Sequence, residues 1–148
     1  MENIISDYPG EWATSPLTSA INDNRVVFVT GRMDVAKYRE KNFNIRIDVE
    51  ISYKATNSGL PDDDDARLLA GITDSLVVTF KKNPVAVLTG IYTGDNKRSW
   101  IFYAKYIHLF QKQFNLALAS FPLLNLTLYS ENDPTWSEYD EMRECLET

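Results

Sequence analysis

The stretch NFNIRIDVEISYK, residues 42–54, alternates apolar and polar side chains along its whole length. Successive side chains of a strand point to opposite faces, so a period of two predicts one long β-strand with one buried and one solvated face. The buried set is Phe43, Ile45, Ile47, Val49, Ile51 and Tyr53. A chain built around this strand must contain a sheet, and Arg46, Asp48 and Glu50 are its candidates for an open sheet face.

Four further segments read as strands. Residues 25–33 (RVVFVTGRM) are β-branched and aromatic, and we expect them to form a hairpin with 43–53 through the polar connection 34–41. Residues 85–93 and 98–106 predict a second hairpin, because the intervening GDNK contains residues that tolerate a left-handed backbone. Residues 123–129 predict a short final strand.

The run Asp62–Asp65 stands directly before apolar residues at helical spacing, and it raises the question of a metal site. Neighbouring helical side chains point about 100° apart and cannot all face one ion. Carboxylates at a helix start instead accept hydrogen bonds from the first N–H groups and meet the positive end of the helix dipole. The run therefore predicts a helix start near Pro61, with an acidic patch that a partner can use, and no metal.

Two more helices follow from the pattern. Apolar residues recur at helical spacing over 107–121, and Pro122 ends that helix. Asp133 and Pro134 are typical of a helix start, and the bulky residues Trp136, Tyr139 and Met142 then follow at spacings of three. This last helix must bury its bulky side, so we expect Trp136 to seal the domain.

The expected class is α+β, with a single antiparallel or mixed sheet, helices mainly on one face, and the order ββαββαβα. Residues 43–129 read βαββαβ, the order of a ferredoxin-like core, to which an N-terminal strand and a C-terminal helix are added. In that core the first strand is internal, which leaves the placement of strand 25–33 open. The 148 residues suit one domain, with 1–23 as an extended arm and 24–148 as the α+β core.

Composition limits the partners. The formal net charge of −6 opposes binding to nucleic acid, because that binding depends on Lys and Arg replacing counterions on phosphates. No apolar stretch approaches the roughly 18 residues that cross a bilayer. A single cysteine and an N-terminus without a signal pattern predict a cytoplasmic protein.

Four stretches carry a family resemblance: Glu11-Trp12, GLPDDDDARLLAGITDSL, GIYTGDNKRSWIFYA and ENDPTWSEYDEM. Together and in this order they resemble the bacterial family catalogued as domain of unknown function 695, over nearly the whole chain. The family has no assigned activity. Some members are encoded fused to, or near, domains resembling the regulator that inhibits ribonuclease E, an acidic α+β protein that acts by binding. The resemblance thus implies a regulatory binding role.

Catalytic groups are scarce in this sequence. His108 is the only histidine, Cys145 is near the C-terminus, and no nucleophile elbow or phosphate loop occurs, so we predict no catalytic residue and no cofactor. We expect a non-catalytic module that binds another protein; the alternative is a small-molecule binding protein or hydrolase that uses the open sheet face. The candidate binding residues are Arg46, Asp48, Glu50, Tyr103, Trp136 and Tyr139.

Overall fold

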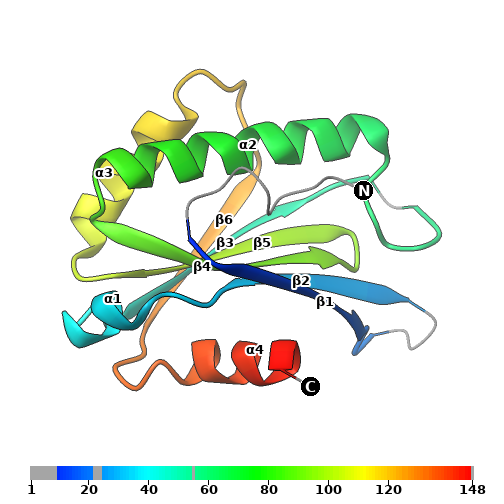
Figure 1. Ribbon diagram of the computed structural model, residues 1–148. Coiled ribbons are helices and arrows are strands. Elements are labelled where there is room, and N and C mark those ends of the chain that lie inside the picture. Colours follow the sequence, from blue (N-terminus) through cyan, green and yellow to red (C-terminus); the bar gives the residue numbers. More distant parts are fainter. Residues whose placement is uncertain (1–9, 22–24, 55, 148) are drawn as a thin grey trace.

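The computed structural model describes residues 10–21, 25–54 and 56–147, whose strands form one six-stranded antiparallel sheet (Figure 1). In chain order the elements are β1 (Trp12–Thr18), β2 (Val26–Arg32), α1 (Ala36–Glu40), β3 (Ile45–Ser52), α2 (Asp63–Lys82), β4 (Ala86–Gly94), β5 (Lys97–Ala104), α3 (Ile107–Leu118), β6 (Leu126–Asn132) and α4 (Ser137–Glu147). The order across the sheet is β1-β2-β4-β5-β3-β6. The predicted α+β class with a single sheet is confirmed.

The larger core lies between the sheet and helices α2 and α3, which cover the same face (Figure 1). The apolar residues of β3 point to this face, as the alternation predicted, and Trp100 and Phe102 of β5 join them without any exposed surface. Phe102 packs on the rings of Phe80 and Phe110, at centroid distances of 5.1 and 5.0 Å. This side of the sheet is closed by apolar contact alone over most of its area.

A smaller core lies on the opposite face, under α4, so the helices are divided between the two faces. Two glycines opposite each other in neighbouring strands, Gly31 of β2 and Gly90 of β4, allow α4 to approach. A Cβ at Gly90 would lie 2.5 Å from the sulfur of Met142, and one at Gly31 would lie 2.5 Å from a methyl group of Leu146. A side chain at either position would force Met142 or Leu146 to move.

Two local predictions are confirmed. The turn between β4 and β5 has Asp95 and Asn96 in the left-handed region, at φ of 52° and 65°, as expected for a tight hairpin. The aspartate run begins α2: Asp62 is the N-cap, and its carboxylate accepts a 2.8 Å hydrogen bond from the backbone N–H of Asp65. Pro61 precedes the cap and lies outside the first turn.

The predicted pairing of 25–33 with 43–53 is wrong. β2 pairs with β1 and β4, whereas both edges of β3 are occupied, by β5 and β6. The connection 34–41 is not a hairpin turn, because it contains the short helix α1 and crosses the sheet from one half to the other. The alternation in β3 is compatible with a central strand. It shows that one face of the strand is solvated, but it does not show which strands pair with its two edges.

Other boundaries moved. Part of the predicted arm, Trp12–Thr18, is the edge strand β1, while residues 1–9 and 22–23 of that arm lie outside the described residues. The final strand begins at Leu126 instead of residue 123, because Leu123 is fully exposed and the ladder with β3 continues to Asn132. Helix α4 begins at Ser137, four residues later than expected from Asp133. Among the described residues, no helix combines the length and apolarity that crossing a membrane requires.

Candidate functional site

The start of α4 is held by one buried carboxylate, Asp133. Its Oδ1 accepts hydrogen bonds from the backbone N–H and the hydroxyl of Ser137, at 3.0 and 2.8 Å, and its Oδ2 accepts from the N–H of Glu138 at 3.2 Å. Tyr103 of β5 donates its hydroxyl to the same Oδ2 at 2.6 Å. Burial raises the pKa of Asp133, but these hydrogen bonds outweigh it and leave the pKa below the usual value. Asp133 thus caps the helix and ties it to the sheet.

Trp136 completes this anchor in a strained conformation. Its φ of 57° is left-handed, which is uncommon for a bulky residue, and the turn that contains it explains why α4 begins late. The indole ring stacks on Tyr103 at a centroid distance of 4.1 Å, and its Nε1–H donates to the carbonyl of Phe43 at 2.9 Å. Trp136 has no exposed surface, so its predicted burial is confirmed.

Beside α4, the solvated side of β3 carries a polar strip. Arg46 forms ion pairs with Asp48 of the same strand, at 3.1 Å, and with Glu131 of β6, at 3.0 Å. Burial raises the pKa of Asp48, and the charge of Arg46 offsets this only in part. Glu50 follows on the same face, with its carboxylate 3.7 Å from the amine of Lys97.

A second carboxyl, Glu138, faces this strip from the first turn of α4. Tyr92 of β4 donates its hydroxyl to Glu138 Oε1 at 3.2 Å, while the buried Oε2 has no hydrogen-bond partner among the described residues. Burial and the nearby charge of Asp48 raise the pKa of Glu138 to about 7, against the smaller opposing effects of Tyr92 and Arg46. Glu138 can therefore gain or lose a proton near neutral pH.

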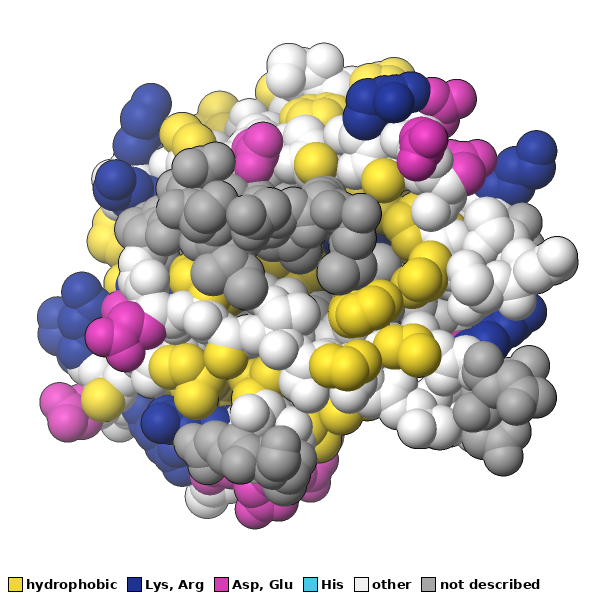
Figure 2. Space-filling model, turned by 45° about the vertical axis from the view of Figure 1, so that its right-hand side comes forward, with side chains coloured by type: hydrophobic (Ala, Val, Ile, Leu, Met, Phe, Trp, Pro, Cys, Tyr) yellow, Lys and Arg dark blue, Asp and Glu magenta, His cyan; other side chains and the backbone are white. Residues whose placement is uncertain are grey.

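We call Asp48, Glu50, Glu131 and Glu138 the acidic strip. These carboxylates outnumber the cations beside them, Arg46 and Lys97. The acidic side chains of α4 extend the negative surface, and they gather along the lower edge of the molecule in Figure 2. Such a surface suits a cationic ligand, and its residues come from β3, β6 and α4.

The strip ends at an open sheet edge. β6 pairs only with β3, and each of its residues after Leu126 is exposed. Tyr129, opposite Asp48, lies on the same face as the strip; it is 53% exposed, and its ring lies 5.8 Å from the Arg46 guanidinium carbon. Leu128, which faces the opposite side, is 42% exposed. An extended segment added to β6 would meet apolar groups on one face and acidic groups on the other.

The predicted site residues fall into two groups: some lie together on the solvated side of β3, and the others are buried under α4. Arg46, Asp48 and Glu50 share one face with Tyr103, because Arg46 is opposite Tyr103 in the β3–β5 ladder. Tyr103, Trp136 and Tyr139 are buried in the core under α4, so they can position the strip without touching a ligand. Whether any of the six contributes to binding stays a prediction.

The candidate binding residues did not include four residues that the fold adds to this site: Tyr92, Glu131, Glu138 and Asp133, which the sequence analysis had only placed at a helix start. One signal was present, since Asp133 and Glu138 lie within the distinctive stretch ENDPTWSEYDEM. In the part of the chain that the structure describes, no three His, Cys, Asp or Glu side chains are grouped to hold a metal ion.

Comparison with known proteins gives a family but no activity. The family model described as "Family of unknown function (DUF695)" matches residues 11–142. No curated protein and no solved structure matches the chain. The matched range contains β1 and most of α4, so it includes every residue of the acidic strip.

Proposed function

The chain belongs to the family of unknown function DUF695, and from the geometry around β6 we propose that it is a non-catalytic module that binds another protein. The partner contributes an extended segment that pairs with the β6 edge and lays basic side chains over the acidic strip. The observation that carries this proposal is the exposed edge of β6 directly beside the strip. A regulatory role would then act through occupation of this edge.

The two edges of the sheet differ in a way that favours β6. An edge strand presents unpaired N–H and C=O groups, and proteins commonly protect such edges with proline or lysine. β1 carries Pro16, which lacks an N–H, whereas β6 has the sequence LTLYSEN with neither residue type. The β6 edge is thus the one suited to strand addition.

The side chains around β6 define the partner. Glu131 is exposed on the strip side, and Tyr129 supplies the aromatic contact that is enriched at protein interfaces. On the other side, Leu128 offers an apolar contact. The matching segment alternates basic and apolar residues, and electrostatic attraction makes its binding sensitive to salt.

We also propose that β3, α2, β4, β5, α3 and β6 form a ferredoxin-like core. The strands of this segment lie in the order β6-β3-β5-β4, which supports that assignment because the fourth strand neighbours the first and the third lies between the first and the second. The resemblance to a bacterial family and a single cysteine support a bacterial, cytoplasmic protein.

The surface can be tested with a capped heptapeptide that alternates lysine and valine, using amide NMR and hydrogen exchange. We expect the peptide to shift and protect the β6 amides, and its affinity to fall as salt is added. A peptide that alternates glutamate and valine should not bind. Equal binding of the two peptides, or protection confined to another element, contradicts the proposal.

Matched variants separate the two edges of the sheet. Leu128→Lys places a lysine on β6, and Thr18→Lys places one at an exposed position of β1, so both add the same charge. We expect Leu128→Lys to raise the dissociation constant of the lysine–valine peptide at least fivefold. Thr18→Lys should leave that constant within twofold of its value for the parent. Equal weakening by both would mean that net charge alone matters.

A second candidate function rests on Glu138. A carboxyl group with a pKa of about 7 beside Asp48 can act as a general acid or base, which supports hydrolysis of a small molecule on this face. Hydrolysis of p-nitrophenyl esters is the assay, with Glu138→Gln compared with Glu141→Gln, an exposed position on the same helix. Loss of turnover in the first variant alone would favour this function over the binding module.

A further inference from the structure

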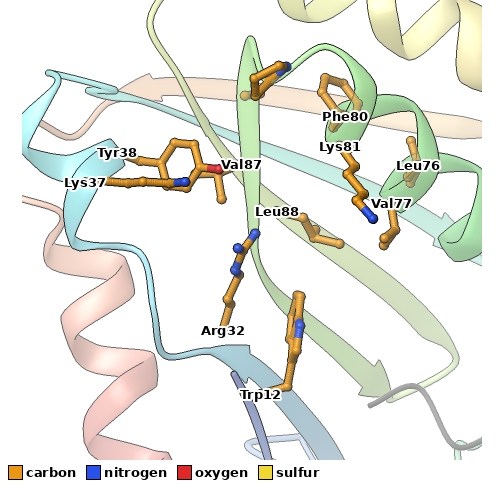
Figure 3. Close-up of a pocket in the computed structure, with 12 residues that line it drawn as sticks. Trp12, Arg32, Lys37, Tyr38, Leu76, Val77, Phe80, Lys81, Val87 and Leu88 are labelled. Carbon is orange, nitrogen blue, oxygen red and sulfur yellow. The ribbon is translucent and has the colours of Figure 1, made fainter. Parts of the chain in front are cut away.

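A pocket of about 300 Å³ lies at the other end of the molecule from the β6 edge. Its lining comes from the start of β1, the end of β2, α1, the C-terminal end of α2 and the first half of β4, and it includes no residue of the acidic strip. Figure 3 shows these side chains around the first half of β4, with Lys37 and Tyr38 on one side of the strand and Lys81 on the other. We call it the basic pocket, after the cations described below.

The pocket lies where the sheet separates. β2 pairs with β4 only over Phe28–Gly31 and Gly90–Thr93, so the first residues of β4 have no β2 residues opposite them. A bulge between Leu88 and Gly90 shifts the β4 register at the same point. Within the described chain, the backbone groups of Ala86–Leu88 that point away from β5 have no strand beside them, and they border the pocket.

Three cationic side chains from three elements line this pocket in a protein whose net charge is −6: Arg32 of β2, Lys37 of α1 and Lys81 of α2 (Figure 3). Arg32 is paired with Asp34 at 2.9 Å and is only 17% exposed, so it is fixed in place. Lys37 and Lys81 form no ion pair among the described residues. The amine of Lys37 lies 5.0 Å from the ring centroid of Tyr38, so its positive charge, like that of Lys81, stands at the wall of the pocket.

The rest of the lining is apolar or aromatic. Leu76, Phe80 and Leu88 belong to the buried core and form its floor, while Trp12 and Tyr38 are half-buried at its walls. A volume of about 300 Å³ is at the lower end of the range for small-molecule sites. Such a lining suits a ligand with an apolar body.

We propose that the basic pocket binds a small organic anion that joins a flat apolar body to a carboxylate or a comparable acidic group. This site is separate from the β6 edge and does not depend on the binding function proposed above. Lys37 and Lys81 attract the acidic group from opposite sides of the pocket, and the ring system packs against Trp12.

The probe is naphthalene-2-carboxylate, compared with naphthalene-2-carboxamide, which has the same shape without the charge. In amide and indole NMR titrations we expect the carboxylate to shift the Trp12 indole signal and the amides near Lys37 and Lys81. Its dissociation constant should be at least tenfold below that of the carboxamide. Equal affinities overturn the role of the cations, and shifts confined to the β3–β6 face overturn the location.

The decisive variants are neighbours in sequence. Lys81→Ala removes a pocket cation, whereas Lys82→Ala removes an equally exposed lysine that is not in the lining. We expect Lys81→Ala to raise the dissociation constant of naphthalene-2-carboxylate at least threefold, Lys37→Ala with Lys81→Ala to raise it at least tenfold, and Lys82→Ala to leave it within 1.5-fold. Equal effects of Lys81→Ala and Lys82→Ala overturn the site, as does inorganic phosphate binding as tightly as the naphthoate.

Discussion

The two faces of the sheet share the same strands but are closed in different ways. Towards α2 and α3, β3 points Ile47 and Val49 into a core of apolar and aromatic side chains. Towards α4, the same strand points Arg46 and Asp48 to the edge of a smaller core, where a buried tyrosine–aspartate hydrogen bond joins helix and sheet. One face is closed by a large apolar core, the other by a smaller apolar core together with a few directional contacts.

The difference follows from how much helix covers each face, because α2 and α3 together cover one face and α4 alone covers the other. α2 has 20 residues and buries a stripe from Leu69 to Phe80, so apolar burial suffices to hold it. α4 has 11 residues, and a helix of that length is marginal in water without tertiary contacts. Its position therefore depends on the packing of Met142 on the sheet and on Asp133 and Trp136, whose interactions form only in one geometry. The face that needs precise anchors also leaves room for polar groups beside them.

The largest expected effect is the loss of stability when a buried aromatic side chain is truncated on each face of the sheet. Phe102→Ala and Trp136→Ala each remove a fully buried ring, and each should lower the free energy of unfolding by about 3 to 5 kcal/mol in denaturant melts. Hydrogen exchange should then differ: Phe102→Ala lowers protection throughout the sheet, whereas Trp136→Ala lowers it most in α4.

Two outcomes would break this part of the comparison. A midpoint for Trp136→Ala within error of the parent, at unchanged slope, would show that the indole does not hold the domain together. Uniform loss of protection in both variants would show that α4 unfolds only with the sheet, and that the faces form one cooperative unit.

A medium effect concerns how the stability of the protein depends on pH through Glu138, on the α4 face. Because the pKa of Glu138 is about 7 in the folded protein and about 4.5 in the unfolded chain, the folded state binds more protons between these values. The contribution of Glu138 to stability is therefore lost as pH rises from about 4.5 to 7, and it stays lost above 7.

Glu138→Gln should remove this loss and stabilise the protein at pH 8 by on the order of 1 to 3 kcal/mol relative to the parent, with little difference near pH 4.5. Denaturant melts across that range measure it, with Glu141→Gln as the exposed control. If the free energy of unfolding changes between pH 5 and 7 by the same amount in the parent and in Glu138→Gln, Glu138 ionises normally in the folded protein.

The smallest expected effect belongs to the opposite face. Asp62→Ala removes the N-cap of α2 and should cost about 1 kcal/mol, while Asp63→Ala loses only an interaction with the helix dipole and should cost a few tenths. Thermal or denaturant melts compare the two. Equal costs would mean that the aspartate run acts through its summed charge and not through one cap.

Periodic and local features were predictable from the sequence. The alternation over 42–54 identified a strand with a solvated face, and the Asp95-Asn96 turn identified the β4–β5 hairpin, because a turn depends on the conformational preferences of its own residues. The helix start at Asp62 was likewise local. Arg46, Asp48 and Glu50 could be placed on one face for the same reason, since side chains two apart on a strand share a face.

The partners across space were decided only by the tertiary structure. The neighbours of β3 depend on non-local ladders, so no pattern within 42–54 distinguishes pairing with β5 from pairing with β2. Glu138 became a buried acid because α4 packs on the sheet beside Tyr92 and Asp48, far away in the chain. Local sequence determines which conformations a segment prefers, whereas the burial and charge that give a site its chemistry arise from the contacts between segments.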